Sequence, residues 1–301
     1  MSEQIIYQHC PACDADAIYP ALSVKDYSVT GEIFEVWHCE DCTLRFTQNT
    51  PDAANILRYY QSANYISHTD TDKGLINRLY HLVRNYTLTV KRKLLLNVIG
   101  KGNRSLLDIG AGTGAFLHIM QQAGWEVTGL EPDLTARQNA KNKYGLILQP
   151  TDNLNSIEAE GFDAITLWHV LEHVHDFHGY LSKFHKILKP SGSLIIALPN
   201  YLSFDAKEYK EYWAAYDVPR HLYHFSPKSM EQLANTYGFV LQETKPMWFD
   251  SFYVSMLSEQ YKNEGGNLIG AVWNGLLSNL KCLGNAKKSS SVIYIFSKNN
   301  S

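Results

Sequence analysis

Short apolar runs alternate with helical segments over the last two thirds of the chain. Seven runs bounded by glycine, proline or polar residues predict buried strands. They are Ser105 to Ile109, WEVTGLEPD, GLILQPTDNL, GFDAITLW, GSLIIALPN, GFVLQETKPMWF and SVIYIFSKN. Between them, Leu134 to Tyr144 and FHGYLSKFHKILKP are expected to form helices that cross between parallel strands. The alternation predicts an α/β fold.

Two further helical regions flank or interrupt this pattern. Pro51 suits a helix entry, and residues 52–99 then carry apolar residues at three-to-four spacing until Gly100. Phe249 to Leu283 is aromatic and apolar with the same spacing, and it lies between the last two predicted strands. We expect a helical connector before the α/β region and a helical cover over it, which could also provide an apolar wall for an acceptor.

Composition and length are those of an ordinary globular protein. With 301 residues, of which 45% are hydrophobic and 19% charged, the chain can form one sizeable domain and a small accessory one. The first residues lack the basic start and apolar run of a signal peptide, and no apolar stretch approaches the ~20 residues that span a bilayer. These observations predict a cytoplasmic protein with reduced thiols.

Four of the five cysteines form two CxxC pairs near the N-terminus. Cys10 and Cys13 stand in HCPACD, and Cys39 and Cys42 stand in WHCEDC. Two such knuckles can complete a closed tetrahedral site, so we predict structural Zn²⁺ in a zinc ribbon. A redox CxxC would stand alone at a helix start, and disulfides are disfavoured in the cytosol. Cys282 is expected to be a small core residue.

Charge is distributed unevenly over the first hundred residues. Residues 1–50 contain eight acidic residues against Lys25 and Arg45, a net charge of −6 that disfavours binding to RNA or DNA. From Lys73 to Arg104 there are eight basic residues and no acidic one. This basic segment predicts either a solvated helix face that balances the ribbon or a surface for an anionic acceptor, lipid or RNA.

A glycine-rich turn follows the first predicted strand of the α/β region. In RSLLDIGAGTGAF, Asp108 ends the strand, and Gly110, Gly112 and Gly114 allow tight backbone geometry and close approach of a ligand. The next strand delivers Glu131, placed 21 residues after Gly110, where an acid can accept hydrogen bonds from a ribose. The spacing predicts a nucleoside-containing cofactor.

These motifs, LLDIGAGTG followed by GLEPD, resemble class I S-adenosylmethionine (SAM)-dependent methyltransferases. The resemblance implies a Rossmann-like seven-stranded fold, with Asp108 near the amino group of the cofactor and Glu131 at its ribose. NAD would instead favour a GxGxxG turn. The further cofactor contacts that it implies are Ala111, Pro132, Asp152, Asn153, Trp168 and His169, with Tyr65 closing the open side.

The stretch HVLEH, His169 to His173, matches the inverted zinc-protease signature H-x-x-E-H. His169 comes directly from a predicted buried strand instead of lying inside a long helix, which disfavours a catalytic metal. Some related quinone O-methyltransferases hold a divalent ion with acids near here, and His169 occupies the first of those positions. We therefore expect Trp168 and His169 to line the cofactor cleft, and Glu172 and His173 to cap or pack.

Residues 201–228 form a long insertion after the fifth predicted strand and end in DVPRHLYHFS. Its length predicts a functional lid, followed by a helix with Ser226 as N-cap. The segment RHLYHFS is similar to a stretch of zinc-ribbon sugar C-methyltransferases, in which the position of His221 is catalytic. The glutamate that precedes it there is Arg220 here, and their large additional C-terminal domain is missing. His221 is thus a candidate base or a structural hydrogen-bonding group, and Arg220, Tyr223 and His224 are candidate substrate contacts. Arg220 could clamp an anionic acceptor or only pair with Asp217.

Together these features predict a zinc ribbon (1–50), a helical connector (51–103) and a methyltransferase domain (104–301) with a lid (201–228) and a helical cover (249–284). The predicted activity is SAM-dependent methyl transfer to oxygen, carbon or nitrogen of a small molecule. The alternatives are a ribosomal RNA methyltransferase, which the acidic ribbon disfavours, and a non-catalytic SAM-binding protein. The sequence leaves the acceptor and the oligomeric state open.

Overall fold

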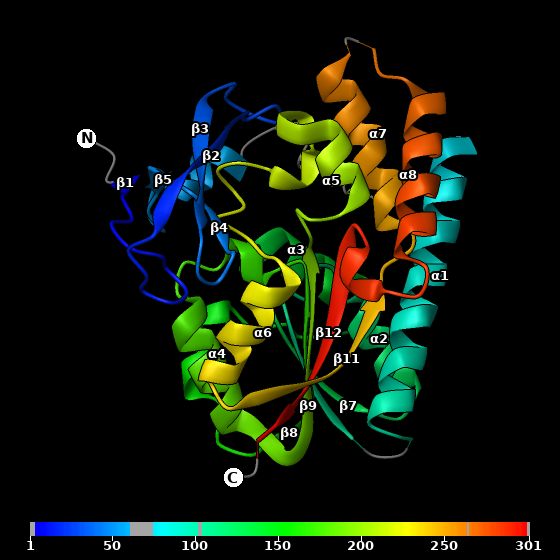
Figure 1. Ribbon diagram of the computed structural model, residues 1–301. Helices are drawn as coiled ribbons and strands as arrows, with labels where there is room; N and C mark the ends of the chain where they lie inside the picture. The colour runs from blue at the N-terminus through cyan, green and yellow to red at the C-terminus, as the bar shows by residue number, and fades with distance from the viewer. Residues whose placement is uncertain (1–3, 61–74, 102–103, 264, 300–301) are drawn as a thin grey trace.

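The computed structural model of the chain describes residues 4–60, 75–101, 104–263 and 265–299 (Figure 1). The helices are α1 (Leu75–Val98), α2 (Ala115–Gln122), α3 (Leu134–Tyr144), α4 (Phe177–Ile187), α5 (Phe204–Tyr209), α6 (Pro227–Thr236), α7 (Asp250–Lys262) and α8 (Leu268–Cys282). Short 3-10 turns are η1 (Ile56–Tyr60), η2 (Thr151–Ser156), η3 (Leu171–His173), η4 (Lys210–Tyr212), η5 (Ala214–Tyr216) and η6 (Ala286–Lys288).

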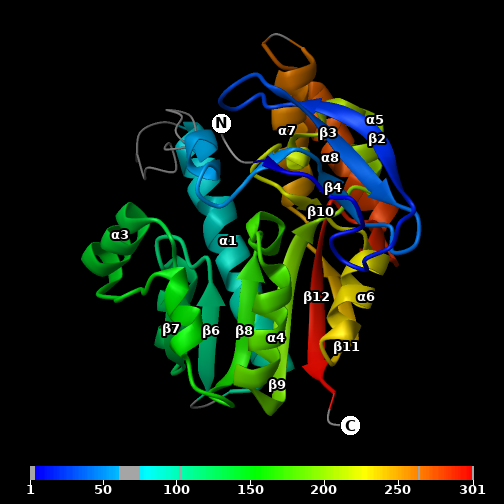
Figure 2. The ribbon, with the colours of Figure 1, turned by 90° about the vertical axis from the view of Figure 1, so that its left-hand side faces the viewer.

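A six-stranded sheet organises the larger part of the described chain. Its strands are β6 (Ser105–Ile109), β7 (Glu126–Leu130), β8 (Phe162–Trp168), β9 (Leu188–Pro199), β11 (Phe239–Pro246) and β12 (Ser291–Lys298). They lie in the order β11-β12-β9-β8-β6-β7. Strands β7, β6, β8 and β9 are parallel, and β12 runs antiparallel to β9 and to β11. The carboxyl ends of the parallel strands therefore meet at one edge, which Figure 2 shows beneath the N-terminal ribbon.

Alternating residues of the strands bury both faces of this sheet. Leu107 and Ile165 pack on one face with apolar residues of α4 and α6, whereas Leu106 and Ala164 pack on the other with residues of α1 and α2. The sheet is thus a middle layer between two helical layers, as the alternation of strands and helices predicts. The predicted α/β architecture is confirmed.

One predicted strand is reduced to a single bridge. The segment GLILQPTDNL was expected to form the third strand, but only Gln149 pairs there, in a parallel bridge with Leu130. The backbone N–H of Gln149 donates to Gly129 O at 3.0 Å, and Pro150 follows at once. Proline has no N–H to continue the ladder, so the pairing ends there. The described residues therefore form six strands of the main sheet and not seven.

The N-terminal region forms a smaller β-structure. Its strands are β1 (Gln4–Ile5), β2 (Ile18–Lys25), β3 (Ile33–Cys39), β4 (Arg45–Thr47) and β5 (Thr50–Pro51). A sheet of order β10-β4-β3-β2 extends from them to β10 (Tyr223–His224), a strand of the distant DVPRHLYHFS segment. The ribbon and the end of the insertion therefore share one sheet.

The insertion at 201–228, whose length predicts a lid, is packed into the fold. Most of its side chains are buried, and Tyr209, Trp213 and Tyr216 form one apolar cluster with Val36 of β3 and Tyr59 of η1. The many aromatic residues explain this burial, because a segment this apolar is stable when it packs between other elements. We call residues 201–226 the joint, since they pack between the ribbon and helices α7 and α8 (Figure 1).

Candidate functional site

The glycine turn between β6 and α2 forms the floor of the candidate site. Gly110, Gly112 and Gly114 have φ angles of 66°, 55° and 75°, a left-handed conformation that favours glycine. A Cβ atom on Gly110 would lie 2.5 Å from Val170 Cγ2, so this position requires glycine for packing as well. A Cβ on Gly112 would meet no atom within 4 Å. The turn thus leaves open space over Gly112 that a ligand can occupy.

Asp108 lies at the end of β6 and is almost completely buried. Its Oδ1 accepts a hydrogen bond from Thr166 Oγ1 of the neighbouring strand β8 at 2.5 Å. Burial raises the pKa of Asp108 to about 7, because the surroundings disfavour the charged carboxylate. A cationic ligand group beside Asp108 would stabilise its ionised form.

Glu131 follows β7 and connects to the glycine turn. Its carboxylate accepts hydrogen bonds from Gly112 N at 2.8 Å and from Asp133 N at 2.9 Å. Burial raises the pKa of Glu131, and the two backbone donors oppose this shift. The side chain is therefore fixed next to the open space over Gly112, where sequence reasoning expected it.

The further predicted cofactor contacts differ in their exposure. Asn153 is half-buried in η2 and its amide donates to Gln149 Oε1 at 3.1 Å, whereas Asp152 and Pro132 are exposed. Ala111 is buried, and its N–H donates to Leu130 O at 3.0 Å. Tyr65 falls outside the described residues.

Helix α1 contributes a cation that sequence reasoning missed. The Nζ of Lys91 lies 4.3 Å from the centroid of the Trp168 ring, and Trp168 Nε1 is buried without a hydrogen-bond partner among the described residues. Burial lowers the pKa of Lys91 to about 8, and the nearby carboxylates of Asp108 and Asp250 oppose this shift. The only signal in the sequence was the basic composition of the connector, which does not single out one lysine.

His169 follows β8 and joins two carboxylates from different elements. Its Nε2 lies 2.8 Å from Asp250 Oδ2 at the start of α7, and its Nδ1 lies 3.5 Å from Glu172 Oε1. Burial alone would lower the pKa of His169, but Asp250 and Glu172 raise it to about 10. His169 is thus an imidazolium at neutral pH, in a left-handed conformation with φ of 57°.

The exit of β8 and the joint place three polar side chains together. Glu172 and His221 are buried and His173 is half-buried; each offers one polar atom, and these atoms lie within 4.8 Å of one another. The rings of His173 and His221 are in edge-to-face contact with centroids 4.5 Å apart. The carboxylate of Glu172 pairs with His169, whose Nδ1 lies 3.5 Å from Oε1, and accepts no closer hydrogen bond from the described residues. A buried carboxylate with this remaining capacity can accept a hydrogen bond from a bound ligand.

The hydrogen bonding of His221 defines its tautomer. Its Nδ1 lies 2.8 Å from Ala215 O, and a carbonyl oxygen can only accept, so Nδ1 carries the hydrogen. In the neutral ring, Nε2 then carries the lone pair. This nitrogen lies 4.0 Å from Asp217 Oδ2, beyond hydrogen-bond distance. His221 can therefore take a proton at Nε2.

Arg220 lies in an ion pair instead of facing open space. Its guanidinium donates to both carboxylate oxygens of Asp217, at 2.6 and 3.0 Å, and to Asp26 Oδ1 of the ribbon at 3.0 Å. Its Nη1 also donates to Tyr59 O at 2.8 Å, and the side chain is 1% exposed. Of the two roles predicted for Arg220, the structure shows the pairing with Asp217, and carboxylates of the chain occupy the donors that a clamp on an anionic acceptor would use.

Tyr223 and His224 form β10 and also face the ribbon. Tyr223 OH is 3.0 Å from Tyr7 OH and donates to His175 O at 3.2 Å, while His224 Nε2 is 3.2 Å from Thr47 Oγ1. Both side chains are buried, and burial lowers the pKa of His224 far below its usual value. The structure places these two predicted substrate contacts in the interface between ribbon and joint.

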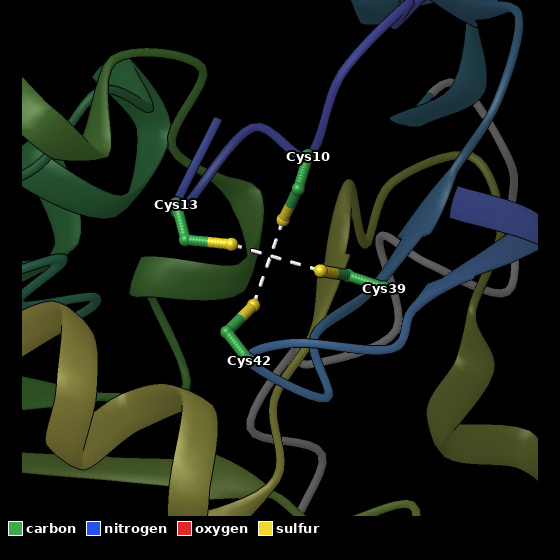
Figure 3. Close-up of side chains that lie close together, drawn as sticks. All are labelled: Cys10, Cys13, Cys39 and Cys42. Atoms are coloured by element: carbon green, nitrogen blue, oxygen red, sulfur yellow. Dashed lines mark hydrogen bonds between the residues drawn. The ribbon is translucent and has the colours of Figure 1, made fainter. Parts of the chain in front are cut away.

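The four N-terminal cysteines converge from two loops (Figure 3). The sulfur of Cys10 lies 3.5 Å from that of Cys42, and the sulfur of Cys13 lies 3.6 Å from that of Cys39. In a tetrahedral site with Zn–S bonds of about 2.3 Å, neighbouring sulfurs are roughly 3.8 Å apart. The donor set and its spacing therefore fit a zinc ion. Cys282 is buried in α8, as predicted.

The fold and the open edge above β6 and β7 define a Rossmann-like protein that binds a nucleoside-containing cofactor at the carboxyl ends of its strands. The chain belongs to the methyltransferase-domain family, whose sequence profile matches residues 81–244. The resemblance to SAM-dependent methyltransferases is thereby confirmed, and the family supports SAM as the cofactor.

Characterised relatives agree over part of their length. A ubiquinone biosynthesis O-methyltransferase from Rhodopseudomonas palustris is 26% identical over 160 residues, which are 48% of this chain and 62% of the relative. The protein of the same name from Haemophilus ducreyi is 34% identical over 112 residues, 34% of this chain and 48% of the relative. The chain thus spans less than two thirds of the length of either relative.

A solved structure shares the fold. It is a candidate sarcosine dimethylglycine methyltransferase from Galdieria sulphuraria, with a TM-score of 0.50 and 18% identity, over 74% of this chain and 88% of that one. None of the described helices is both long and apolar enough to cross a membrane.

Proposed function

We propose that this protein is a SAM-dependent methyltransferase that acts on oxygen, carbon or nitrogen of a small-molecule acceptor. The observation that carries the proposal is His221, a buried histidine whose Nε2 is free to take a proton near the buried carboxylate of Glu172. The relatives are named for O-methylation in ubiquinone biosynthesis, which supports a small acceptor. As the sequence predicts, we expect the protein in the cytoplasm, with RNA and DNA disfavoured as substrates.

The residues around the glycine turn fit the parts of SAM. When bound, SAM supplies a methyl group on a positively charged sulfur. A nucleophile can bond to this methyl group, and the sulfur then leaves as a neutral thioether. Glu131 would accept hydrogen bonds from the ribose hydroxyls, and Asp108 would accept one from the amino group. Lys91 would pair with the carboxylate of the methionine part, because its Nζ lies against Trp168 at the end of β8 and its charge interacts with Asp108 at the end of β6. The open space over Gly112 allows the close approach that such contacts need.

His221 would act as the general base. Methylation of a hydroxyl or an acidic carbon requires that its proton leave, and a neutral imidazole takes protons near neutral pH. The proton would move to Nε2, while Nδ1–H continues to donate to Ala215 O. Glu172 would stabilise the resulting imidazolium, because its buried negative charge interacts with His221. The ribbon holds the backbone of this residue, since Thr47 Oγ1 donates to the carbonyl oxygen of His221 at 2.7 Å.

We further propose that Cys10, Cys13, Cys39 and Cys42 hold structural Zn²⁺. The four-thiolate set leaves no open coordination position, so the metal would fold the ribbon and take no part in the chemistry. Strand β4, which follows the second knuckle, pairs with β10 in the register Phe46 with Tyr223. Zinc would therefore support the joint that carries His221.

The test of the activity uses methyl-labelled SAM and an extract of the source cells. Label in small metabolites or lipids, lost by at least 100-fold in His221→Gln, is the expected result. The control is His185→Gln, since His185 lies in α4 against Phe239 at the far end of the fold. Label in RNA would favour the ribosomal alternative. SAM binding without transfer to any fraction would favour a non-catalytic protein.

The test of the metal is the zinc content of the purified protein. One zinc per chain is expected, and Cys42→Ser should lose it together with the thermal stability of the ribbon. Cys282→Ser is the matched control, because this buried cysteine lies far from the cluster in α8. Full zinc content in Cys42→Ser, or none in the wild type, would contradict the proposal.

A further inference from the structure

Helix α8 buries its small residues and exposes its large apolar ones. The buried positions are Ala271, Gly275, Ser278 and Cys282. Gly275 is required by close packing on α7, because a Cβ there would lie 2.7 Å from Phe252 Cδ1. A helix on the surface of a globular protein ordinarily turns its large apolar residues inward. The arrangement in α8 is the reverse.

Seven large apolar side chains form the exposed side of α8. They are Leu268, Ile269, Val272, Trp273, Leu276, Leu280 and Leu283, with exposed fractions between 41% for Leu276 and 84% for Ile269. At 3.6 residues per turn they occupy one arc of about 140°. Their exposed surface is on the order of 800 Å², whereas the largest apolar patch of a typical monomer covers roughly 300–600 Å². We call these seven residues the α8 face.

The chain segments that carry α8 and α1 are basic. Residues 265–301 contain four lysines and no acidic residue, and residues 73–104 contain eight basic residues and no acidic one. Lys281 in the last turn of α8 and Lys288 after it are exposed, whereas Lys287 pairs with Glu231. Arg92 and Lys93 are exposed on α1. Figure 1 shows α8 and α1 along the same side of the molecule. Tyr86 on α1, 55% exposed, contacts Phe249 before α7 with ring centroids 5.2 Å apart.

The exposed apolar side chains and the basic residues together discriminate between possible partners of the α8 face. A second copy of the chain would bring the same basic helices toward each other, because a two-fold interface is built from the same patch twice. A nucleic acid would match the charge but not seven large apolar side chains. An anionic lipid bilayer matches both, since its acyl region accepts apolar residues and its headgroups attract lysine and arginine.

We propose that the α8 face docks this protein on the surface of an anionic lipid bilayer, with the basic residues of α1 and of 281–288 against the headgroups. The helix would lie in the plane of the interface, consistent with its being too short to cross a membrane. Helix α7, on which α8 packs, begins at Asp250, the residue that pairs with His169. Docking would therefore bring the bilayer close to the candidate active site.

The experiment is co-sedimentation of the full-length protein with vesicles. Vesicles of phosphatidylcholine with phosphatidylglycerol should bind it, and vesicles of phosphatidylcholine alone should bind at least 10-fold less. Ile269→Gln should weaken binding roughly 10-fold, because one large apolar side chain no longer enters the lipid. The matched control is Ile147→Gln, since Ile147 is 81% exposed but lies outside the α8 face, and it should bind like the wild type.

A second variant tests the charge without touching the α8 face. Lys281→Glu should weaken binding to anionic vesicles by roughly 10-fold at low salt and leave the unfolding midpoint unchanged. Equal binding to neutral and anionic vesicles, or equal loss in Ile147→Gln and Ile269→Gln, would overturn the proposal. A third outcome would also overturn the proposal. If the protein does not bind vesicles, sediments as a dimer and becomes monomeric in Ile269→Gln, the α8 face is a subunit interface.

Discussion

The cofactor side and the joint side of the candidate site are built in opposite ways. On the cofactor side, the carboxylate of Glu131 accepts from Gly112 N, a residue only 19 positions earlier. On the joint side, Arg220 pairs with Asp26 across 194 positions and Thr47 pairs with His221 across 174. A local strand–turn–helix unit needs few outside contacts, whereas the joint exists only when the ribbon is folded. The comparison implies that SAM binding and catalysis can be separated by mutation.

The largest effect is expected from breaking the buried ion pair of the joint. Asp26 is 1% exposed and accepts from Arg220 and from the backbone N–H groups of Ser28 and Thr30. Asp26→Ala would leave Arg220 with one carboxylate fewer and should lower the free energy of unfolding by about 3–5 kcal/mol, measured by urea denaturation.

Asp16→Ala is the matched control for this variant. Asp16 is also an aspartate of the ribbon, and its side chain is 90% exposed, so its removal should change the free energy of unfolding by less than about 0.5 kcal/mol. Equal destabilisation by the two variants would show that the joint does not depend on the buried pair.

A smaller effect, confined to the cofactor side, is expected for Glu131→Ala. The change removes the acceptor proposed for the ribose and should weaken SAM binding by roughly 10- to 100-fold in calorimetry, because hydrogen bonds to charged groups contribute about 1.5–3 kcal/mol. The turnover rate at saturating SAM should fall much less. A Kd for SAM like that of the wild type would remove Glu131 from the cofactor site.

Thr47→Val should affect turnover and not SAM binding, the reverse of Glu131→Ala, and its effect should be smaller. The substitution removes the hydrogen bond from the ribbon to His221 O without a large change in shape. We expect a turnover rate reduced by roughly 5-fold and an unchanged Kd for SAM, since a buried hydrogen bond contributes about 1 kcal/mol. Thr236→Val, at an exposed position of α6, is the control. A weakened Kd for SAM in Thr47→Val would show that the two sides are not separable.

The smallest expected effect is the release of less than one proton per chain when SAM binds. Burial raises the pKa of Asp108 to about 7, so at pH 6 the carboxyl is mostly protonated in the free protein. The cationic amino group of SAM would favour the carboxylate, lower this pKa and release a proton on binding. SAM affinity should therefore rise as the pH increases from 6 to 8. Calorimetry at pH 6 in buffers of different ionisation enthalpy measures the number of protons released on SAM binding. Asp108→Asn should abolish this release.

The same contrast explains what the sequence could predict. Strand β6, the start of α2 and the position of Glu131 agree with the prediction, because their signals lie within one βαβ unit. Lys91 and Asp250 were missed, since only the tertiary fold brings α1 and α7 to the site. For Arg220, the pairing with the nearby Asp217 was one of the two predicted roles, whereas its second partner Asp26 was missed because it lies 194 positions away in the chain.

The burial of the insertion was not predicted, although the composition of the segment indicates it. Only the length of the insertion was used, and it predicted a lid. Tyr209, Trp213 and Tyr216 recur at three-to-four spacing, and all three are almost completely buried. A hydrophobic pattern analysis confined to 201–216 would have identified a packed element.

The pairing of β4 with β10 also has a consequence for synthesis. Thr47 and His224 are hydrogen-bonded across 177 positions of the chain. At about 5–20 residues per second, the ribosome adds these residues in roughly 9–35 s. For that time the nascent ribbon has its cysteines but not its neighbouring strand, so metal loading can precede docking. The proposed zinc ion can therefore bind before the sheet is complete.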